Sequence, residues 1–148
     1  MRTSVAALAL IRRAAPTGDE YLTQWNEKWG MYSLVGGHVE GEETFRECCV
    51  REVAEELELA LGVGFAVAER PMRPEVEYTA MSGGAKVETR YRVELFAVEL
   101  RTPEAVAKVS AMPENRWLTL PEVSAGATTD GKPVSAQVTT VFTLSGVL

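Results

Sequence analysis

The acidic residues of this chain are concentrated in one short stretch. Eight glutamates and two arginines lie between Gly36 and Leu59, and their net charge of −6 equals that of all 148 residues. Crowded carboxylates repel one another unless a cation lies among them, and hard divalent cations such as Mg²⁺ prefer oxygen ligands. The stretch therefore predicts a divalent-metal site.

A loop followed by a helix would carry these carboxylates. Glycines interrupt the first part of the stretch, and Thr44 with Glu47 then fits a capping box, so we expect a helix from Thr44 to about Leu57. Residues at i, i+3 and i+4 are neighbours on a helix surface. That spacing places three carboxylates along one helix edge: Glu52, Glu55 and Glu56. A simply solvated acidic face is the alternative interpretation.

The order of these residues resembles the signature of the Nudix hydrolase family, G-x5-E-x7-R-E-U-x-E-E-x-G-U, where U is a bulky aliphatic residue. The match runs from Gly37 and Glu43 to Arg51-Glu52-Val53-Ala54-Glu55-Glu56-Leu57-Glu58-Leu59. So many fixed positions over 23 residues make a specific motif.

Two positions depart from the family pattern. Glu58 stands where the family has the glycine that ends the helix, and Val35 stands where a proline is common. A glutamate in a left-handed cap costs about 1 kcal/mol, so we expect the helix to end differently, near Gly62 or Gly64. Neither departure removes a carboxylate.

The resemblance implies the roles of the motif residues. The metal, Mg²⁺ or Mn²⁺, would be held by Glu52, Glu55, Glu56 and the backbone carbonyl of Gly36. Glu56 is the first choice for the ligand nearest the catalytic base, and Glu52 is the second. Arg51 would orient a carboxylate, with Glu43 as the expected partner, by a bidentate bond.

The reaction that the resemblance implies is metal-dependent hydrolysis of a nucleoside diphosphate linked to another moiety, by attack of a metal-activated water on the pyrophosphate. A catalytically inactive Nudix-fold module that binds or senses a nucleotide is the alternative. An isomerase of isoprenoid diphosphates shares the fold, but the short chain has no obvious extension for that activity.

Further candidates lie inside and around the motif. His38 is the only histidine, and we expect it to face substrate or solvent rather than a metal, because hard cations prefer oxygen. Trp29 and Tyr32, close to Trp25, could stack on a nucleobase, with core or rim packing as the alternative. Glu114 stands where some family members carry an extra acidic ligand or base. Five arginines on or near expected strands are candidates for binding phosphate: Arg70, Arg73, Arg90, Arg92 and Arg116.

Composition sets the wider limits. At 148 residues, we expect a single Nudix domain over residues 1–148. A pI near 4.9 argues against nucleic-acid polymers and anionic membranes as partners. The only cysteines, Cys48 and Cys49, are adjacent and would not pair within a helix, which fits a reducing cytoplasm. We expect Cys49 in the core and Cys48 beside the carboxylates; a homodimer, as in many relatives, is left open.

The remaining pattern predicts a mixed α/β (α+β) domain. We expect a turn over Ala14–Glu20 and a hairpin whose turn is Ser82–Ala85. Residues 102–104 predict a short helix or a loop, Pro121–Ser124 a brief helix or turn, and the segment from Pro133 a helix or a strand. The expected strands are Thr3–Arg12, Tyr21–Trp25, Met31–Val35, Gly64–Arg73, Glu75–Met81, Lys86–Leu100 and Arg116–Leu120. The resemblance implies a mixed β-sheet sandwiched between α-helices.

Overall fold

The computed structural model describes residues 1–82 and 87–148. Its strands are β1 (Arg2–Ala15), β2 (Gly18–Asn26), β3 (Met31–Ser33), β4 (Gly36–His38), β5 (Phe65–Val67), β6 (Val76–Met81), β7 (Glu88–Leu100) and β8 (Asn115–Thr119). Its helices are α1 (Phe45–Leu57), α2 (Pro103–Ala111), α3 (Leu120–Ala125) and α4 (Ala136–Leu144). None of the helices in the described part of the chain is long and apolar enough to cross a membrane.

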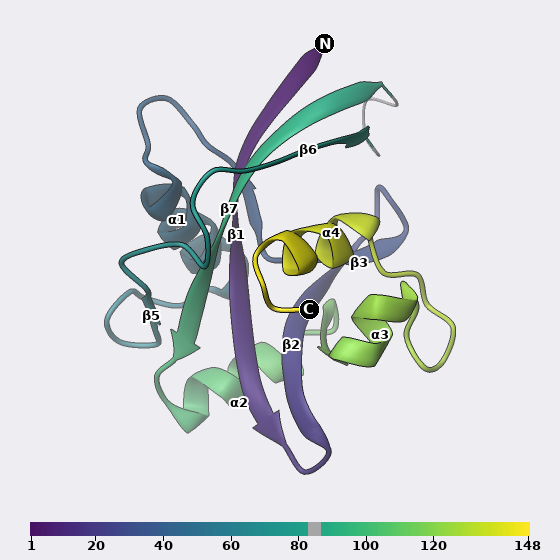
Figure 1. Cartoon of the computed structure of the whole chain (residues 1–148). Helices are drawn as coiled ribbons and strands as arrows, with labels where there is room; N and C mark the ends of the chain where they lie inside the picture. The colour runs from purple at the N-terminus through teal and green to yellow at the C-terminus, as the bar shows by residue number, and fades with distance from the viewer. Residues whose placement is uncertain (83–86) are drawn as a thin grey trace.

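All eight strands join one mixed sheet around the long strands β1 and β7 (Figure 1). The sheet follows the order β3-β2-β1-β7-β5, with β4 pairing with β1, β6 with β7 and β8 with β2. The pair β1–β7 is parallel, from Arg2↔Thr89 to Ile11↔Val98, and the other pairs are antiparallel. This parallel pair is the axis of the fold.

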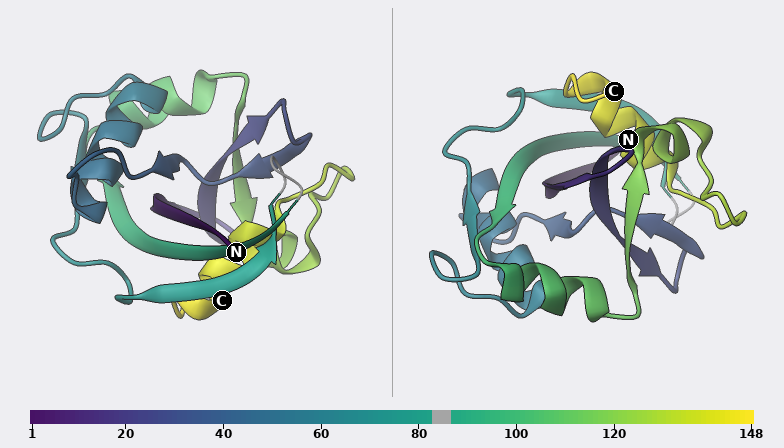
Figure 2. Two further views of the ribbon diagram at one scale, coloured as in Figure 1. Left: turned by 90° about the horizontal axis from the view of Figure 1, so that it is seen from above. Right: turned by 90° about the horizontal axis from the view of Figure 1, so that it is seen from below.

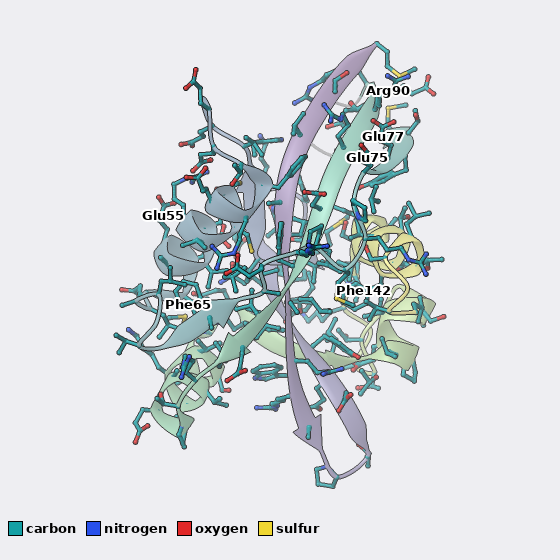
Figure 3. All side chains as sticks on the ribbon, turned by 60° about the vertical axis from the view of Figure 1, so that its left-hand side comes forward. Glu55, Phe65, Glu75, Glu77, Arg90 and Phe142 are labelled. Carbon is teal, nitrogen blue, oxygen red and sulfur yellow. The ribbon has the colours of Figure 1, made fainter. Side chains whose placement is uncertain are left out.

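Helices cover both faces of this axis (Figure 2). Successive residues of a strand point to opposite faces, and β1 is buried on both. Ala7, Ala9 and Ile11 share one core with α1 and α2, including Val53 and Val109. A second core on the other face joins β1 to α3 and α4: Ala6, Leu8, Leu10, Val123, Val138 and Phe142. Figure 3 shows Phe65 and Phe142 on opposite sides of the β1–β7 pair. The predicted sheet between helices is confirmed.

One turn and one strand were predicted too long. Only Pro16 and Thr17 separate β1 from β2, because the strands stay paired as far as Ala15↔Gly18, so the expected turn over Ala14–Glu20 is too long. Similarly, β5 covers Phe65–Val67 and not Gly64–Arg73. Proline cannot donate to a ladder, and the two prolines at the end of that segment leave an irregular connection to β6.

The predicted hairpin is confirmed by the antiparallel pairing of β6 with β7, from Val76↔Val93 to Met81↔Glu88. The predicted turn, Ser82–Ala85, falls outside the described residues except for Ser82.

Three local ambiguities are resolved in favour of helix. Thr102 accepts a hydrogen bond from the backbone N–H of Ala105 and Pro103 occupies the first turn, so α2 forms. Thr119 and Glu122 form a capping box that starts α3. Ser135 caps α4. The Val and Thr residues of α4 favour a strand, but the segment is a helix because its buried face packs on the sheet.

The predicted helix to about Leu57 is confirmed, but the later end that we expected near Gly62 or Gly64 is wrong. The helix ends at Leu57, and Glu58 itself adopts the left-handed cap, with φ 52° and ψ 46°. The backbone therefore keeps the cap conformation that the family's glycine would favour. The side-chain amine of Lys108 in α2 donates a hydrogen bond to the carbonyl of Glu58. A cation at a helix C-terminus is favourable, and this contact partly offsets the strain.

Candidate active site

The centre of the site is the contact between the two glycines of β4 and two carboxylates of α1. The backbone N–H of Gly36 donates to Oε2 of Glu56 at 3.3 Å. A Cβ added to Gly37 would lie 2.6 Å from Cδ of Glu52, closer than carbon atoms pack. Glycine is therefore needed so that the carboxylates of α1 can reach the backbone of β4.

Glu56 carries a strong electrostatic penalty at this position. Burial raises its pKa to about 8, and the neighbouring Glu52 adds to the increase by repulsion and by a shared hydrogen bond. A carboxyl group held this way resists ionisation near neutral pH unless a positive charge approaches. This is the electrostatic environment that a bound cation would relieve.

Arg51 ties the loop before α1 to the helix. Its Nε and Nη2 atoms donate to the two oxygens of Glu43 at 2.6 and 3.0 Å. Its Nη1 donates to Oε1 of Glu52 at 3.0 Å, and Nη2 also donates to the carbonyl of His38 at 3.2 Å. The Arg51 hydrogen bond, followed by the backbone contact with Glu40, lowers the pKa of Glu43 to about 2. Arg51 thus connects the carboxylates of α1 to the loop and to β4.

Glu55 lies apart from the other two carboxylates. Its side chain is 60% exposed and one oxygen is 3.5 Å from Nη1 of Arg51. Figure 3 shows Glu55 on the side of α1 that faces away from the sheet. In residues 1–82 and 87–148, no group of three or more His, Cys, Asp or Glu side chains gathers closely enough to hold a metal ion. A metal site made by three glutamates therefore stays a prediction. It requires the side chain of Glu55 to leave its contact with Arg51 and move towards Glu52 and Glu56.

A cleft of about 520 Å³ adjoins β4 on the face of β1 that α4 covers. Gly36 and Gly37 border it, so β4 contacts the α1 carboxylates and the cleft together. His38 also borders it, with its Nε2 2.9 Å from Oγ of Ser4, and so does Trp29, which is 36% exposed. This volume is in the range of small-molecule sites.

Other predicted residues lie elsewhere. Tyr32 packs edge-on against Trp25 at 5.0 Å and under the guanidinium of Arg116 at 5.8 Å, so its ring takes part in rim packing. Glu114 is exposed before β8, and its carbonyl accepts a hydrogen bond from the backbone of Trp25. The structure does not bring either residue to the cleft, and their predicted substrate roles remain untested.

The two cysteines are buried and unpaired. Cys49 belongs to the core, as expected. Cys48 donates its thiol hydrogen to the carbonyl of Gly37 at 3.3 Å, so it supports β4 from beneath. Burial raises the pKa of both thiols, which keeps them protonated at neutral pH.

Sequence reasoning missed the cationic and amide side chains that border the cleft: Arg2, Asn26, Lys28 and Gln137. Arg2 shares a strand face with Ser4, Ala6 and Leu8, and that period-two spacing was the one available signal. Of the arginines considered instead, Arg92 pairs with Glu77, Arg116 with Asp130, and Arg73 binds the carbonyl of Leu144.

The family model for the NUDIX domain matches residues 2–141. The chain therefore belongs to the Nudix family, and its motif keeps every carboxylate of the family signature. A search among curated protein sequences gives no significant match.

Solved structures of the same fold cover nearly the whole chain. The Ap4A hydrolase of C. elegans is 17% identical with a TM-score of 0.66, over 97% of this chain and 96% of that one. The MutT protein of Methanosarcina mazei Go1 is 18% identical with a TM-score of 0.60, over 98% and 94%. NrtR of Shewanella oneidensis, in complex with a 27mer DNA, is 13% identical with a TM-score of 0.64, over 95% of this chain and 59% of that one. At these identities the likeness shows the fold alone.

Proposed function

We propose that this chain hydrolyses the pyrophosphate bond of a nucleoside diphosphate linked to another moiety, and that it requires Mg²⁺ or Mn²⁺. The observation that carries the proposal is the contact of Glu52 and Glu56 with the glycine backbone of β4, whose Gly36 and Gly37 also border the ligand-sized cleft. The family match makes the same chemistry the expected one.

The residues present fit a hard divalent cation. Glu52 and Glu56 offer carboxylate oxygens at the backbone of Gly36 and Gly37, and the carbonyl of Gly36 is the further ligand that the family resemblance implies. The raised pKa of Glu56 marks a place where positive charge is needed. Glu55 would complete the set after leaving Arg51. When bound, the cation would neutralise the diphosphate charge and lower the pKa of a water molecule.

The chain's own side chains would then orient the reactants and move a proton. Glu56 is the first candidate for the proton acceptor, because its carboxylate lies against the backbone of Gly36, which borders the cleft. Glu52 is the second, held by Arg51 at 3.0 Å. Arg2 and Lys28 border the cleft and would attract the substrate's phosphates, while His38 would contact the substrate at the cleft edge.

The test is phosphate release, coupled to a pyrophosphatase or a phosphatase, over a panel of nucleoside triphosphates, nucleotide sugars, ADP-ribose, dinucleoside polyphosphates and NADH. Each is assayed with Mg²⁺, Mn²⁺ or EDTA. We expect metal-dependent turnover of one class, and a loss of about 100-fold or more in Glu56→Gln. Glu42→Gln, at an exposed residue of the same acidic stretch, is the matched control and should keep full activity.

Either of two results would count against the proposal. Turnover retained in Glu56→Gln would show that the metal assignment is wrong. Silence across the panel, together with nucleotide-dependent thermal stabilisation, would favour the nucleotide-binding module. The homodimer, the exclusion of nucleic-acid polymers and the cytoplasmic location stay predictions for separate measurement.

A further inference from the structure

Two cavities meet on the face of the sheet next to α4. The larger is the cleft of about 520 Å³ that contains the β4 glycines, and the smaller is about 220 Å³. Trp29, Tyr91 and Gln137 border both cavities. A ligand anchored at β4 can therefore extend past these three side chains into the smaller cavity.

The two cavities differ in charge. Arg2, Lys28 and His38 border the larger one. The described residues around the smaller one are all uncharged and are dominated by aromatic, methionine and amide side chains: Trp29, Tyr78, Tyr91, Met31, Met81 and Gln137. Phosphates suit the first environment, and a flat uncharged group suits the second.

Aromatic rings give the smaller cavity flat walls. Tyr78 of β6 and Tyr91 of β7 are directly opposite in the sheet, and their rings stack at 5.0 Å with 16° between the planes. The sheet register thus fixes the position of Tyr91. Trp29, on the loop after β2, also borders this cavity and is 36% exposed. Aromatic side chains of this kind bind bases by stacking.

A side-chain amide also borders this cavity. Gln137 is half-buried in the first turn of α4, which lies beside β6 (Figure 2). Its backbone N–H donates a hydrogen bond to the hydroxyl of Ser135. The hydroxyl of Tyr78 is buried and makes no hydrogen bond in the described residues, although Gln137 is close enough to influence it. A glutamine amide offers both a donor and an acceptor, as a base edge requires.

We propose that the smaller cavity binds the nucleobase of the substrate against Trp29 and Tyr91, and that Gln137 reads the hydrogen-bonding edge of the base. This inference rests on the proposed function, which places the diphosphate at β4. Gln137 is then the residue that determines which base is accepted, and the uncharged walls exclude a phosphorylated or acidic group from this position.

The test measures binding without hydrolysis. The full chain, in EDTA, is titrated calorimetrically with AMP, GMP, CMP, UMP and ribose 5-phosphate. We expect at least one nucleotide to bind about tenfold more tightly than ribose 5-phosphate, and Trp29→Ala to remove about that factor. Gln137→Leu should reduce the differences among the four nucleotides, while Gln24→Leu, the only other glutamine in the chain, should leave them unchanged.

Ribose 5-phosphate binding as tightly as every nucleotide would overturn the proposal. So would a base preference that Gln137→Leu leaves intact in a protein with an unchanged Tm. The binding measurement needs neither metal nor turnover. A chain that binds bases but hydrolyses nothing would therefore contradict the proposed reaction and leave the proposed base site intact. The reverse result, hydrolysis without base preference, would contradict the subsite alone.

Discussion

The guanidinium of Arg51 donates hydrogen bonds from two nitrogens to the carboxylate of Glu43, at 2.6 and 3.0 Å. Its third nitrogen donates to the carboxylate of Glu52 at 3.0 Å. One side chain therefore links the loop before α1 to a carboxylate of the site. A lysine at this position has the charge but not the planar fork, so it can keep only part of this geometry.

The first prediction concerns this link. Arg51→Lys should fold, because α1 keeps its capping box and its buried face. Loss of a group that orients metal ligands typically costs 10–100-fold, and we expect about that increase in the Mg²⁺ concentration needed for half-maximal activity. Arg46→Lys, on the same helix but directed at the carbonyls of Val67 and Ala68, is the control. An unchanged Mg²⁺ requirement in Arg51→Lys would contradict the positioning role.

The second prediction separates a steric clash from backbone strain. In Gly37→Ala the new methyl group would displace the carboxylate of Glu52, and a displacement of about 1 Å can reduce activity by about 100-fold. In Gly41→Ala the methyl group meets open space, although the backbone has φ +53°. We therefore expect Gly41→Ala to lower Tm and keep most activity. Equal losses of activity, measured by kcat at saturating metal, would show that the clash is not decisive.

The third prediction is a pH dependence of stability in the metal-free protein. Folding raises the pKa of Glu56 from 4.5 to about 8, so the folded state binds a proton that the unfolded state has lost. Stability should therefore fall as pH rises through this window. Calorimetric Tm values in EDTA, from about pH 5 to about pH 9, should decline more steeply for the wild type than for Glu56→Gln. Added Mg²⁺ should reduce the decline by favouring the carboxylate.

Glu43 provides the opposite sign and an internal comparison. Its pKa is lowered to about 2, so its contribution is present above pH 4.5 and is lost as pH falls towards 2. The pH ranges in which Glu43 and Glu56 affect stability do not overlap.

Parallel Tm curves for wild type and Glu56→Gln above pH 5 would contradict the third prediction, because they would mean that Glu56 ionises normally.

The fourth prediction concerns the left-handed residue at the end of α1. Glu58→Gly should stabilise the protein by about 1 kcal/mol, because glycine adopts φ 52° without steric cost. Activity should change little, since Glu58 is exposed. Urea unfolding measures the gain, and Glu58→Ala, which keeps the Cβ, should not show it. A large loss of activity in Glu58→Gly would instead assign Glu58 to the site.

Much of the acidic stretch was determined by local sequence. The capping box of Thr44 and Glu47, the start of α1 and the family of the chain all follow from residues close together along the chain. The β6–β7 hairpin could also be predicted, because strand periodicity and turn residues are local signals. The sheet between helices was expected from the family resemblance that the motif carries.

Tertiary structure decided what local signals could not. Glu58 takes a conformation that its own propensity opposes, because the chain must turn there towards β5 and Lys108 from α2 binds its carbonyl. The raised pKa of Glu56 depends on burial against β4, which no spacing reveals. Likewise Arg2, Trp29 and Gln137 come from three distant parts of the chain and meet at one cleft only because β1, the loop after β2 and α4 pack together. Contacts of this kind depend on long-range packing, so the residues next to each one in the sequence do not predict them.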